Sequence, residues 1–276
     1  MSALWTGGAD VAGWQFMSAM GELPNARPSP GTGRRAASAL FADDPIARPL
    51  TYPGRIPASS GVLVDDTYVP LRPIPGRRPE EWQAGERTLG SLLDRHGGSH
   101  PRHLVAAVGS NAAPGQLRRK FLDHGVRPVV PMTLADVPGV APGVSAHVSK
   151  WGYVPAAPVD TPGESSRLFV LWLDERQLAA LDLTEPNYDR RPLGDPVTVA
   201  PGLRLPPPFV YRGRHGCLPG ADGRPLRLTA QRELIQSLLD ESAAMRALCG
   251  DTPEDFVRNV KDETVREGVY RLFHSL

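Results

Sequence analysis

Runs of apolar residues through the middle of the chain predict a series of strands. Residues 104–108 (LVAAV) form a short continuous apolar run of the kind found in buried strands. Further strands, separated by turns rich in proline and glycine, are predicted at residues 127–132, 144–149, 168–173, 196–199 and 209–212.

Helical spacing interrupts this series directly after the first strand. Pro114 suits the first turn of a helix, and the apolar positions predict that it runs to about residue 124. Leu117 and Phe121 share its inward face. The basic residues predicted to face solvent on this helix are Arg118, Arg119 and Lys120.

The N-terminal part of the chain has a different pattern. Proline recurs throughout residues 1–80, and at this density it blocks helix interiors and sheet ladders. Much of this segment is therefore expected to be extended, wrapped on the surface or mobile. Residues 11–20 have helical spacing, residues 61–71 alternate as a strand does, and residues 79–95 predict a helix. The first turn of the helix predicted at 79–95 contains Glu80 and Glu81.

The C-terminal part is predicted to be helical. Residues 229–248 form a strongly amphipathic pattern, and residues 252–276 predict one or two further helices. The chain therefore divides into a Pro/Gly-rich extension at 1–100, a mixed domain at 101–225 and a helical segment at 226–276 that packs on it.

Composition narrows the function classes. The chain has 31 basic and 30 acidic residues and a net charge of +1, so nothing in its charge balance calls for nucleic acid. It has no apolar run of about 18 residues and no signal-peptide pattern, which favours a soluble cytoplasmic protein and no membrane partner. His96, His100 and His103 lie in a Gly/Ser/Pro loop, so no metal is expected.

The turn after the first strand is a candidate anion site. Gly109, Ser110 and Asn111 join the strand to the helix, an arrangement that directs backbone N–H groups toward one spot. Glycine permits backbone torsions closed to other residues, and the two short polar side chains can cap N–H groups or contact a ligand. The same turn can also be purely structural.

A carboxylate at the end of a second helix is the candidate acid/base. Residues 175–183 are predicted to be helical, with Asp174 as the cap, and Pro186 forces Glu185 out of the helical conformation. A carboxylate there, beside an aromatic residue and facing a pocket, can accept and return a proton. The alternative is that Glu185 and Asp182 are ordinary surface acids paired with nearby arginines.

Together, the two motifs resemble the gamma-glutamylcyclotransferase-like family. Members of that family have a strand ending in Tyr-Gly-Ser-Asn and, later, a helix ending in Leu-Asp-x-x-Glu-Gly with a tyrosine a few residues on. Residues 108–111 (VGSN) and 181–185 (LDLTE), followed by Tyr188, occur here in the same order. Val108 stands where the family has an aromatic residue, and Pro186 where it has glycine.

The resemblance implies an α+β fold, a compact mixed α/β barrel with its pocket at one end. In that pocket Glu185 would be the catalytic acid/base. The residues implied to bind substrate are Val108, Gly109, Ser110, Asn111, Tyr188 and Tyr211. Trp151 and Tyr153, in a Pro/Gly loop, would either rim the pocket or plug the barrel.

The implied reaction releases 5-oxoproline and a free amine from a gamma-glutamyl amide, without cofactor or metal. The expected partner is therefore a small molecule with a gamma-glutamyl or similar acidic amide group, bound by a monomer or homodimer. Two alternatives stay open. The protein could process another amide or lactam, or it could be a non-catalytic member of the fold that binds a metabolite or another protein.

Overall fold

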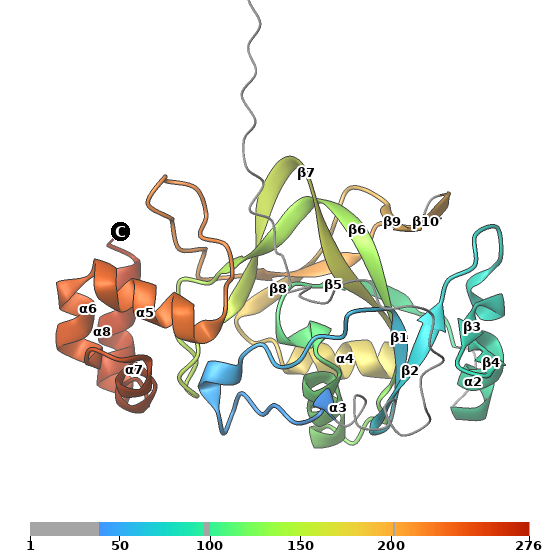
Figure 1. Ribbon diagram of the computed structural model, residues 1–276, viewed down its shortest axis with the longest axis horizontal. Helices are drawn as coiled ribbons and strands as arrows, with labels where there is room; N and C mark the ends of the chain where they lie inside the picture. The colour runs from blue at the N-terminus through green and yellow to red at the C-terminus, as the bar shows by residue number, and fades with distance from the viewer. Residues whose placement is uncertain (1–38, 97–99, 201, 276) are drawn as a thin grey trace, which may run out of the picture.

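The computed structural model describes residues 39–96, 100–200 and 202–275. The fold is α+β: a mixed sheet, with helices packed around it (Figure 1). The described part of the sheet follows the order β4-β3-β2-β1-β6-β7-β5-β11-β8, and β9 pairs with both β6 and β10. The strands are β1 (Gly61–Val64), β2 (Thr67–Arg72), β3 (Gln83–Ala84), β4 (Arg87–Thr88), β5 (His103–Ala107), β6 (Val129–Val144), β7 (Ala156–Leu173), β8 (Tyr188–Pro192), β9 (Val197–Ala200), β10 (Leu203–Leu205) and β11 (Phe209–Gly213).

The long antiparallel pair of β6 and β7 is the centre of the sheet. It is paired from Met132 with Leu171 to Val144 with Ala156. The register shifts after Pro138, where residues 162–164 of β7 have no partner in β6, and pairing resumes at Gly139 with Thr161. The prediction of a separate strand at 144–149 is wrong, since β6 ends at Val144.

The barrel is not confirmed. The strand path through the described residues is open, with β4 at one edge and β8 at the other. Strands β6 and β7 curve strongly across the molecule (Figure 1), and β5 joins β11 as a parallel pair between antiparallel neighbours. The sheet is thus mixed and bent, but its edges do not meet.

Two helices cover the face of the sheet near the candidate site. They are α3 (Pro114–Asp123) and α4 (Glu175–Leu183), both close to the predicted bounds. Leu117 and Phe121 are fully buried, as predicted, and pack with Leu181 in one core cluster. Asp174 caps α4, since its carboxylate accepts a hydrogen bond from the Gln177 amide.

The N-terminal segment contributes to the same sheet. Strands β1 and β2 form a hairpin, and β1 pairs with β6, Gly61 opposite Met132. The helix predicted at 79–95 is shorter, because Gly85, at φ +59°, turns the chain between β3 and β4. Only η2 (Pro79–Glu81) and α2 (Leu89–His96) are helical there. The helix predicted at 11–20 lies outside the described residues.

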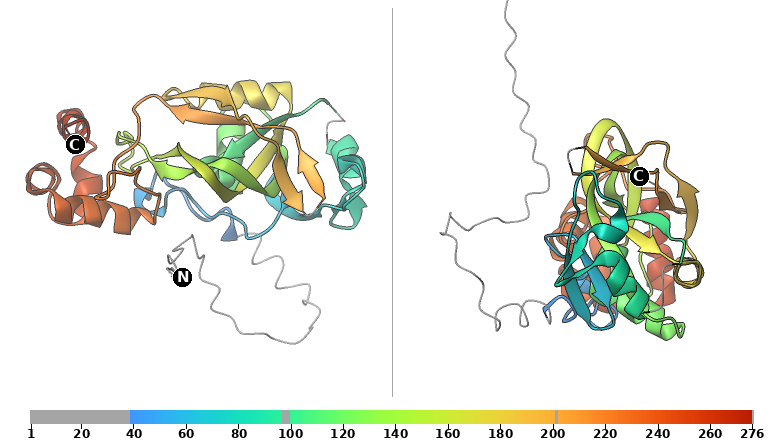
Figure 2. Two further views of the ribbon diagram at one scale, coloured as in Figure 1. Left: turned by 90° about the horizontal axis from the view of Figure 1, so that it is seen from above. Right: turned by 90° about the vertical axis from the view of Figure 1, so that its right-hand side faces the viewer.

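The C-terminal helices form one end of the molecule and α2 the other (Figures 1 and 2). They are α5 (Gln231–Glu241), α6 (Ala243–Cys249), α7 (Pro253–Asn259) and α8 (Glu263–Phe273). The single helix predicted at 229–248 is broken at Ser242, whose side chain caps α6. Ile235 and Val269 pack with Val144 in a shared core. None of the helices in the described ranges is long and apolar enough to cross a membrane.

Candidate functional site

The turn after β5 approaches another segment so closely that only glycine fits. A side-chain Cβ at Gly109 would lie 2.6 Å from the hydroxyl oxygen of Tyr52 and 2.8 Å from Cβ of Ala156. Both distances are shorter than any van der Waals contact between such atoms. Gly109 is therefore required by close packing at this point, and the one-turn helix η3 (Ser110–Ala112) follows directly.

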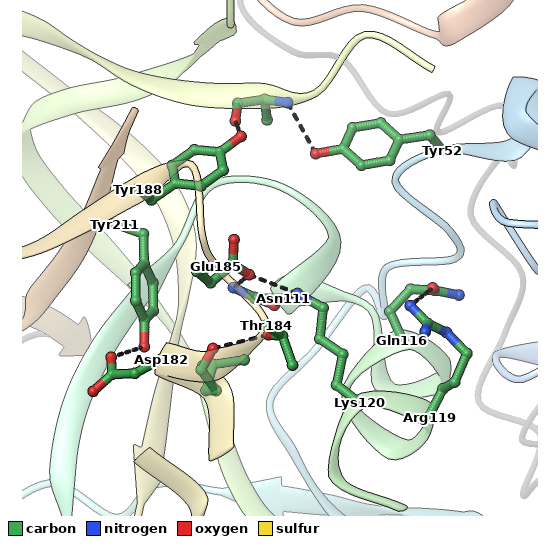
Figure 3. Close-up of polar contacts among 12 residues, drawn as sticks. Tyr52, Asn111, Gln116, Arg119, Lys120, Asp182, Thr184, Glu185, Tyr188 and Tyr211 are labelled. Carbon is green, nitrogen blue, oxygen red and sulfur yellow. Dashed lines mark hydrogen bonds and ion pairs between the residues drawn. The ribbon is translucent and has the colours of Figure 1, made fainter. Parts of the chain in front are cut away.

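Glu185 lies beside this turn, although it is distant in sequence. The last residue of α4 is Leu183, Thr184 is the C-cap, and the backbone then turns at Pro186. Nδ2 of Asn111 donates a hydrogen bond to Oε1 of Glu185 at 3.0 Å (Figure 3). The structure thus brings together the two motifs that the sequence analysis selected.

Lys120 contacts both Asn111 and Glu185, and the prediction that its side chain faces solvent is wrong. Its Nζ lies 2.6 Å from Oε1 of Glu185 and 2.7 Å from Oδ1 of Asn111. The Lys120 and Glu185 side chains are only 10% and 11% exposed. Lys120 was expected to face solvent with Arg118 and Arg119, but it lies on the face of α3 that also buries Leu117. The three side chains form one nearly buried network of lysine, amide and carboxylate.

The second carboxylate oxygen of Glu185 is left free by this network. Asn111 and Lys120 both contact Oε1, and no hydrogen-bond partner of Oε2 occurs among the described residues. Figure 3 shows the free oxygen directed toward the side of the site where Tyr52 and Tyr188 lie. The network therefore holds the carboxylate through one oxygen and leaves the other oxygen without a partner among the described residues.

Two tyrosines meet at one peptide unit across from Glu185. The hydroxyl of Tyr52 accepts a hydrogen bond from the Ala156 amide at 2.9 Å, and that of Tyr188 donates to the Ala156 carbonyl at 2.8 Å (Figure 3). Tyr153 stacks on Tyr52 with ring centroids 4.4 Å apart. Trp151, the other aromatic residue of that loop, is more exposed and lies under Lys150. Of the two loop aromatics, Tyr153 is thus the one in contact with a site tyrosine.

The electrostatics of the site keep these phenols neutral. Burial raises the pKa of Tyr52, Tyr153 and Tyr188, and the negative charge of Glu185 raises each of them further. A tyrosine with a raised pKa keeps its O–H proton at physiological pH. The site thus combines a carboxylate with hydroxyl groups that act as hydrogen-bond donors.

Tyr211 and Val108 have less direct positions than predicted for ligand-binding residues. The Tyr211 hydroxyl donates to Asp182 at 2.7 Å, and Arg190 pairs with the same carboxylate. Asp182 is therefore an ordinary ion-paired acid, as the alternative interpretation held. The side chain of Val108 packs into a different core cluster, so only its backbone borders the turn.

Comparison with solved structures finds distant likenesses, among them the following two. A protein from Arabidopsis thaliana, solved in solution, is 16% identical with a TM-score of 0.34, over 52% of this chain and 86% of that chain. An AIG2-like protein from Mus musculus, in a crystal structure at 1.90 Å, is 18% identical with a TM-score of 0.29, over 48% of this chain and 100% of that chain. No family model matches the chain, and no curated protein matches its sequence. Likenesses of this size do not decide a function, so the residues of the site must.

Lys120 and Tyr52 are the two members of the site that the sequence analysis did not select. For Lys120 a signal existed, because it follows Leu117 by three residues and Gln116 by four, which places it on the inward face of a helix. For Tyr52 the signal is missing. It lies in the proline-rich segment, far from the motifs, and only the fold brings it to the turn.

A separate cavity lies away from the site. It has a volume of about 500 Å³ and is bordered by α2 and the sheet, with Leu93, Arg102, Trp172 and Phe209 among its walls. No residue of the Glu185 network lines it. Within the ranges that the structure describes, no group of three or more His, Cys, Asp or Glu residues is placed to hold a metal ion.

A buried histidine behind Tyr188 predicts acid sensitivity. Nδ1 of His147 lies 2.7 Å from Oγ of Ser145, and its ring contacts His215 at 4.4 Å between centroids. Burial, together with the neighbouring His215, lowers the pKa of His147 from 6.5 to about 3. Below pH 6.5 the His147 imidazole therefore binds a proton in the unfolded chain but not in the folded chain. The free energy of unfolding consequently decreases as the pH is lowered.

We expect His147 to account for a loss of about 2 kcal/mol in unfolding free energy between pH 6.5 and pH 5. Urea unfolding of wild type and His147→Gln at both pH values measures it, and the variant should lose correspondingly less. The exposed His124 provides the control His124→Gln, which should retain the wild-type dependence. Equal losses in wild type and His147→Gln would contradict the assignment.

Proposed function

We propose that this protein is an enzyme of the gamma-glutamylcyclotransferase type, which releases 5-oxoproline and a free amine from a gamma-glutamyl amide. The observation that supports this most is the position of Glu185. Its Oε1 is held by Asn111 and Lys120 beside the Gly109 turn, and its Oε2 is free. A fixed carboxylate with one open oxygen is what an acid/base needs.

In the proposed reaction Oε2 of Glu185 takes a proton from the neutral α-amine of the substrate. The amine nitrogen forms a bond to the γ-carbonyl carbon, and the bond from that carbon to the leaving nitrogen breaks. The same glutamate returns its proton to the departing amine. Both reacting groups belong to one molecule, so folding the substrate into a ring geometry supplies much of the rate.

The remaining residues would bind and orient the substrate. Ser110 and Asn111 would border its polar end, the ring of Tyr188 would close the opposite side, and the ring of Tyr211 would bound the site near α4. Val108 would contribute through its backbone alone, because its side chain packs elsewhere. Asn111 and Lys120 would act through Glu185, as positioning residues. A cytoplasmic location would suit this proposal.

A second candidate function is binding without catalysis. It is favoured by the Lys120–Glu185 pair itself, because nearly buried ion pairs also occur as purely structural features. In that case the site would hold a small acidic metabolite and leave it unchanged.

Product analysis separates the two functions. The full-length protein is incubated with a panel of gamma-glutamyl amides, including dipeptides, glutathione and gamma-glutamyl alkylamines, and 5-oxoproline is measured by mass spectrometry. We expect release from at least one member, above the level in heat-denatured protein. Saturable binding of 5-oxoproline without release from any member would favour the binding function, and the absence of both would contradict the two proposals together.

A further inference from the structure

Tyr52 reaches the site from a part of the chain that neither motif includes. The short helix η1 (Pro49–Thr51) precedes it, and the Tyr52 amide donates to the Pro49 carbonyl at 3.1 Å. The side chain is 6% exposed and belongs to the core that joins β6 and β7 to the C-terminal helices. Its position is therefore set by packing, and its ring is held further by the stack on Tyr153.

The hydroxyl of Tyr52 lies against the backbone of the Gly109 turn. The space that a Cβ at Gly109 would fill is 2.6 Å from that oxygen. On its other side the oxygen accepts the hydrogen bond from the Ala156 amide. The glycine thus makes room for the phenol, and the amide fixes the direction of the oxygen.

The hydroxyl proton of Tyr52 is not bound by any acceptor in the part of the chain that the structure describes. The oxygen already acts as an acceptor for Ala156, and none of the described residues provides an acceptor for its O–H. Tyr188 differs, because its proton goes to the Ala156 carbonyl. Burial and the nearby Glu185 raise the pKa of Tyr52, so the proton stays in place at neutral pH. An unused donor and the free Oε2 acceptor of Glu185 therefore flank the same site (Figure 3).

We propose that Tyr52 is a substrate-binding residue whose hydroxyl donates a hydrogen bond to the α-carboxylate of the ligand. An amino-acid head group carries a proton-donating nitrogen and an anionic carboxylate on one carbon. Glu185 suits the first and Tyr52 the second. The inference rests on the proposed function for the identity of the ligand, and it gives the N-terminal segment a part in the site.

Binding measurements on Tyr52→Phe test the inference without relying on turnover. Dissociation constants of 5-oxoproline and of its carboxamide are measured by calorimetry on the full chain. A hydrogen bond to a charged group contributes more than one to a neutral group, by about a factor of two in energy. We expect the variant to bind 5-oxoproline about 10- to 100-fold more weakly than wild type, and the carboxamide about 3-fold more weakly or less.

Tyr68→Phe is the matched control. Tyr68 also lies in the N-terminal segment, and its hydroxyl donates to the Ser59 carbonyl at 2.8 Å, away from the site. This variant should bind both ligands as wild type does. Equal weakening of both ligands in Tyr52→Phe would indicate a structural role and overturn the inference, as would unchanged binding of 5-oxoproline.

Failure of the proposed catalytic function can be distinguished experimentally from failure of the role proposed for Tyr52. If wild type releases no 5-oxoproline from any amide but binds it in a Tyr52-dependent way, the catalytic proposal fails and the role of Tyr52 stands. If wild type binds neither 5-oxoproline nor its carboxamide, the role of Tyr52 is overturned whatever the turnover assay shows.

Discussion

Glu185→Gln is expected to lower kcat on a responsive gamma-glutamyl amide by a factor of about 10²–10⁴, the usual contribution of a positioned acid/base. The glutamine amide cannot take the proton that the carboxylate takes. Its oxygen can still accept from Asn111 and Lys120, so the geometry around α4 is preserved. With that oxygen in the Oε1 position, the glutamine NH2 group replaces Oε2 and cannot accept from the ligand nitrogen, so affinity for 5-oxoproline should fall as well. The value of kcat at saturating substrate is therefore the measure of the proton-transfer step.

Glu175→Gln provides the matched control for this variant. Glu175 lies at the other end of α4, where its side chain is 85% exposed and pairs with His103. Glu175→Gln makes the same chemical change as Glu185→Gln, but at a residue outside the site. The steady-state kinetics of this variant should therefore match those of wild type. Turnover by Glu185→Gln within a factor of three of wild type would remove Glu185 from the mechanism.

Local patterns predicted most of the helices near the site. The bounds of α3 and α4 follow from Pro114, the Asp174 cap and Pro186, which act within a single turn of chain. The same kind of signal located β5 and β11. These elements position the candidate site, and their juxtaposition could be proposed because two short motifs suggested it.

Long-range features could not be derived in the same way. Strand β6 continues past Pro138 because its partner β7 supplies a shifted register, and no local rule reveals that partner. The curvature of the sheet and its open edges depend on pairings between strands far apart in sequence, so the barrel was expected and an open path was found. The position of Tyr52 could not be derived from local patterns either, because it depends on how the segment around η1 packs against the core.

Lys120 is an intermediate case. Its charge and its two basic neighbours favoured a solvated face, whereas its helical position favoured burial. A buried lysine is tolerated only when it is paired, and the partner, Glu185, lies 65 residues away. Helical periodicity could therefore have indicated that the Lys120 side chain points inward. The ion pair with Glu185 that stabilises the buried lysine, however, is formed only by the fold.

Lys120→Met is expected to lower the free energy of unfolding by about 3–5 kcal/mol, because it leaves the nearly buried carboxylate of Glu185 without its cation. Methionine has nearly the length of the lysine side chain and replaces its apolar stem, so the loss reports mainly on the charge. Denaturant unfolding followed by circular dichroism at pH 7 measures it. Lys261→Met, at an exposed position, should unfold as wild type does.

The double variant Lys120→Met/Glu185→Gln distinguishes the pair from simple loss of packing. Removing both charges leaves no uncompensated ion, and the glutamine can still accept from Asn111. We therefore expect the double variant to recover at least half of the stability lost in Lys120→Met, which gives a coupling energy well above the few tenths of a kcal/mol found for independent sites. If the two losses simply add, the 2.6 Å contact contributes nothing specific. Asn111 alone would then be the residue that holds the Glu185 carboxylate in place.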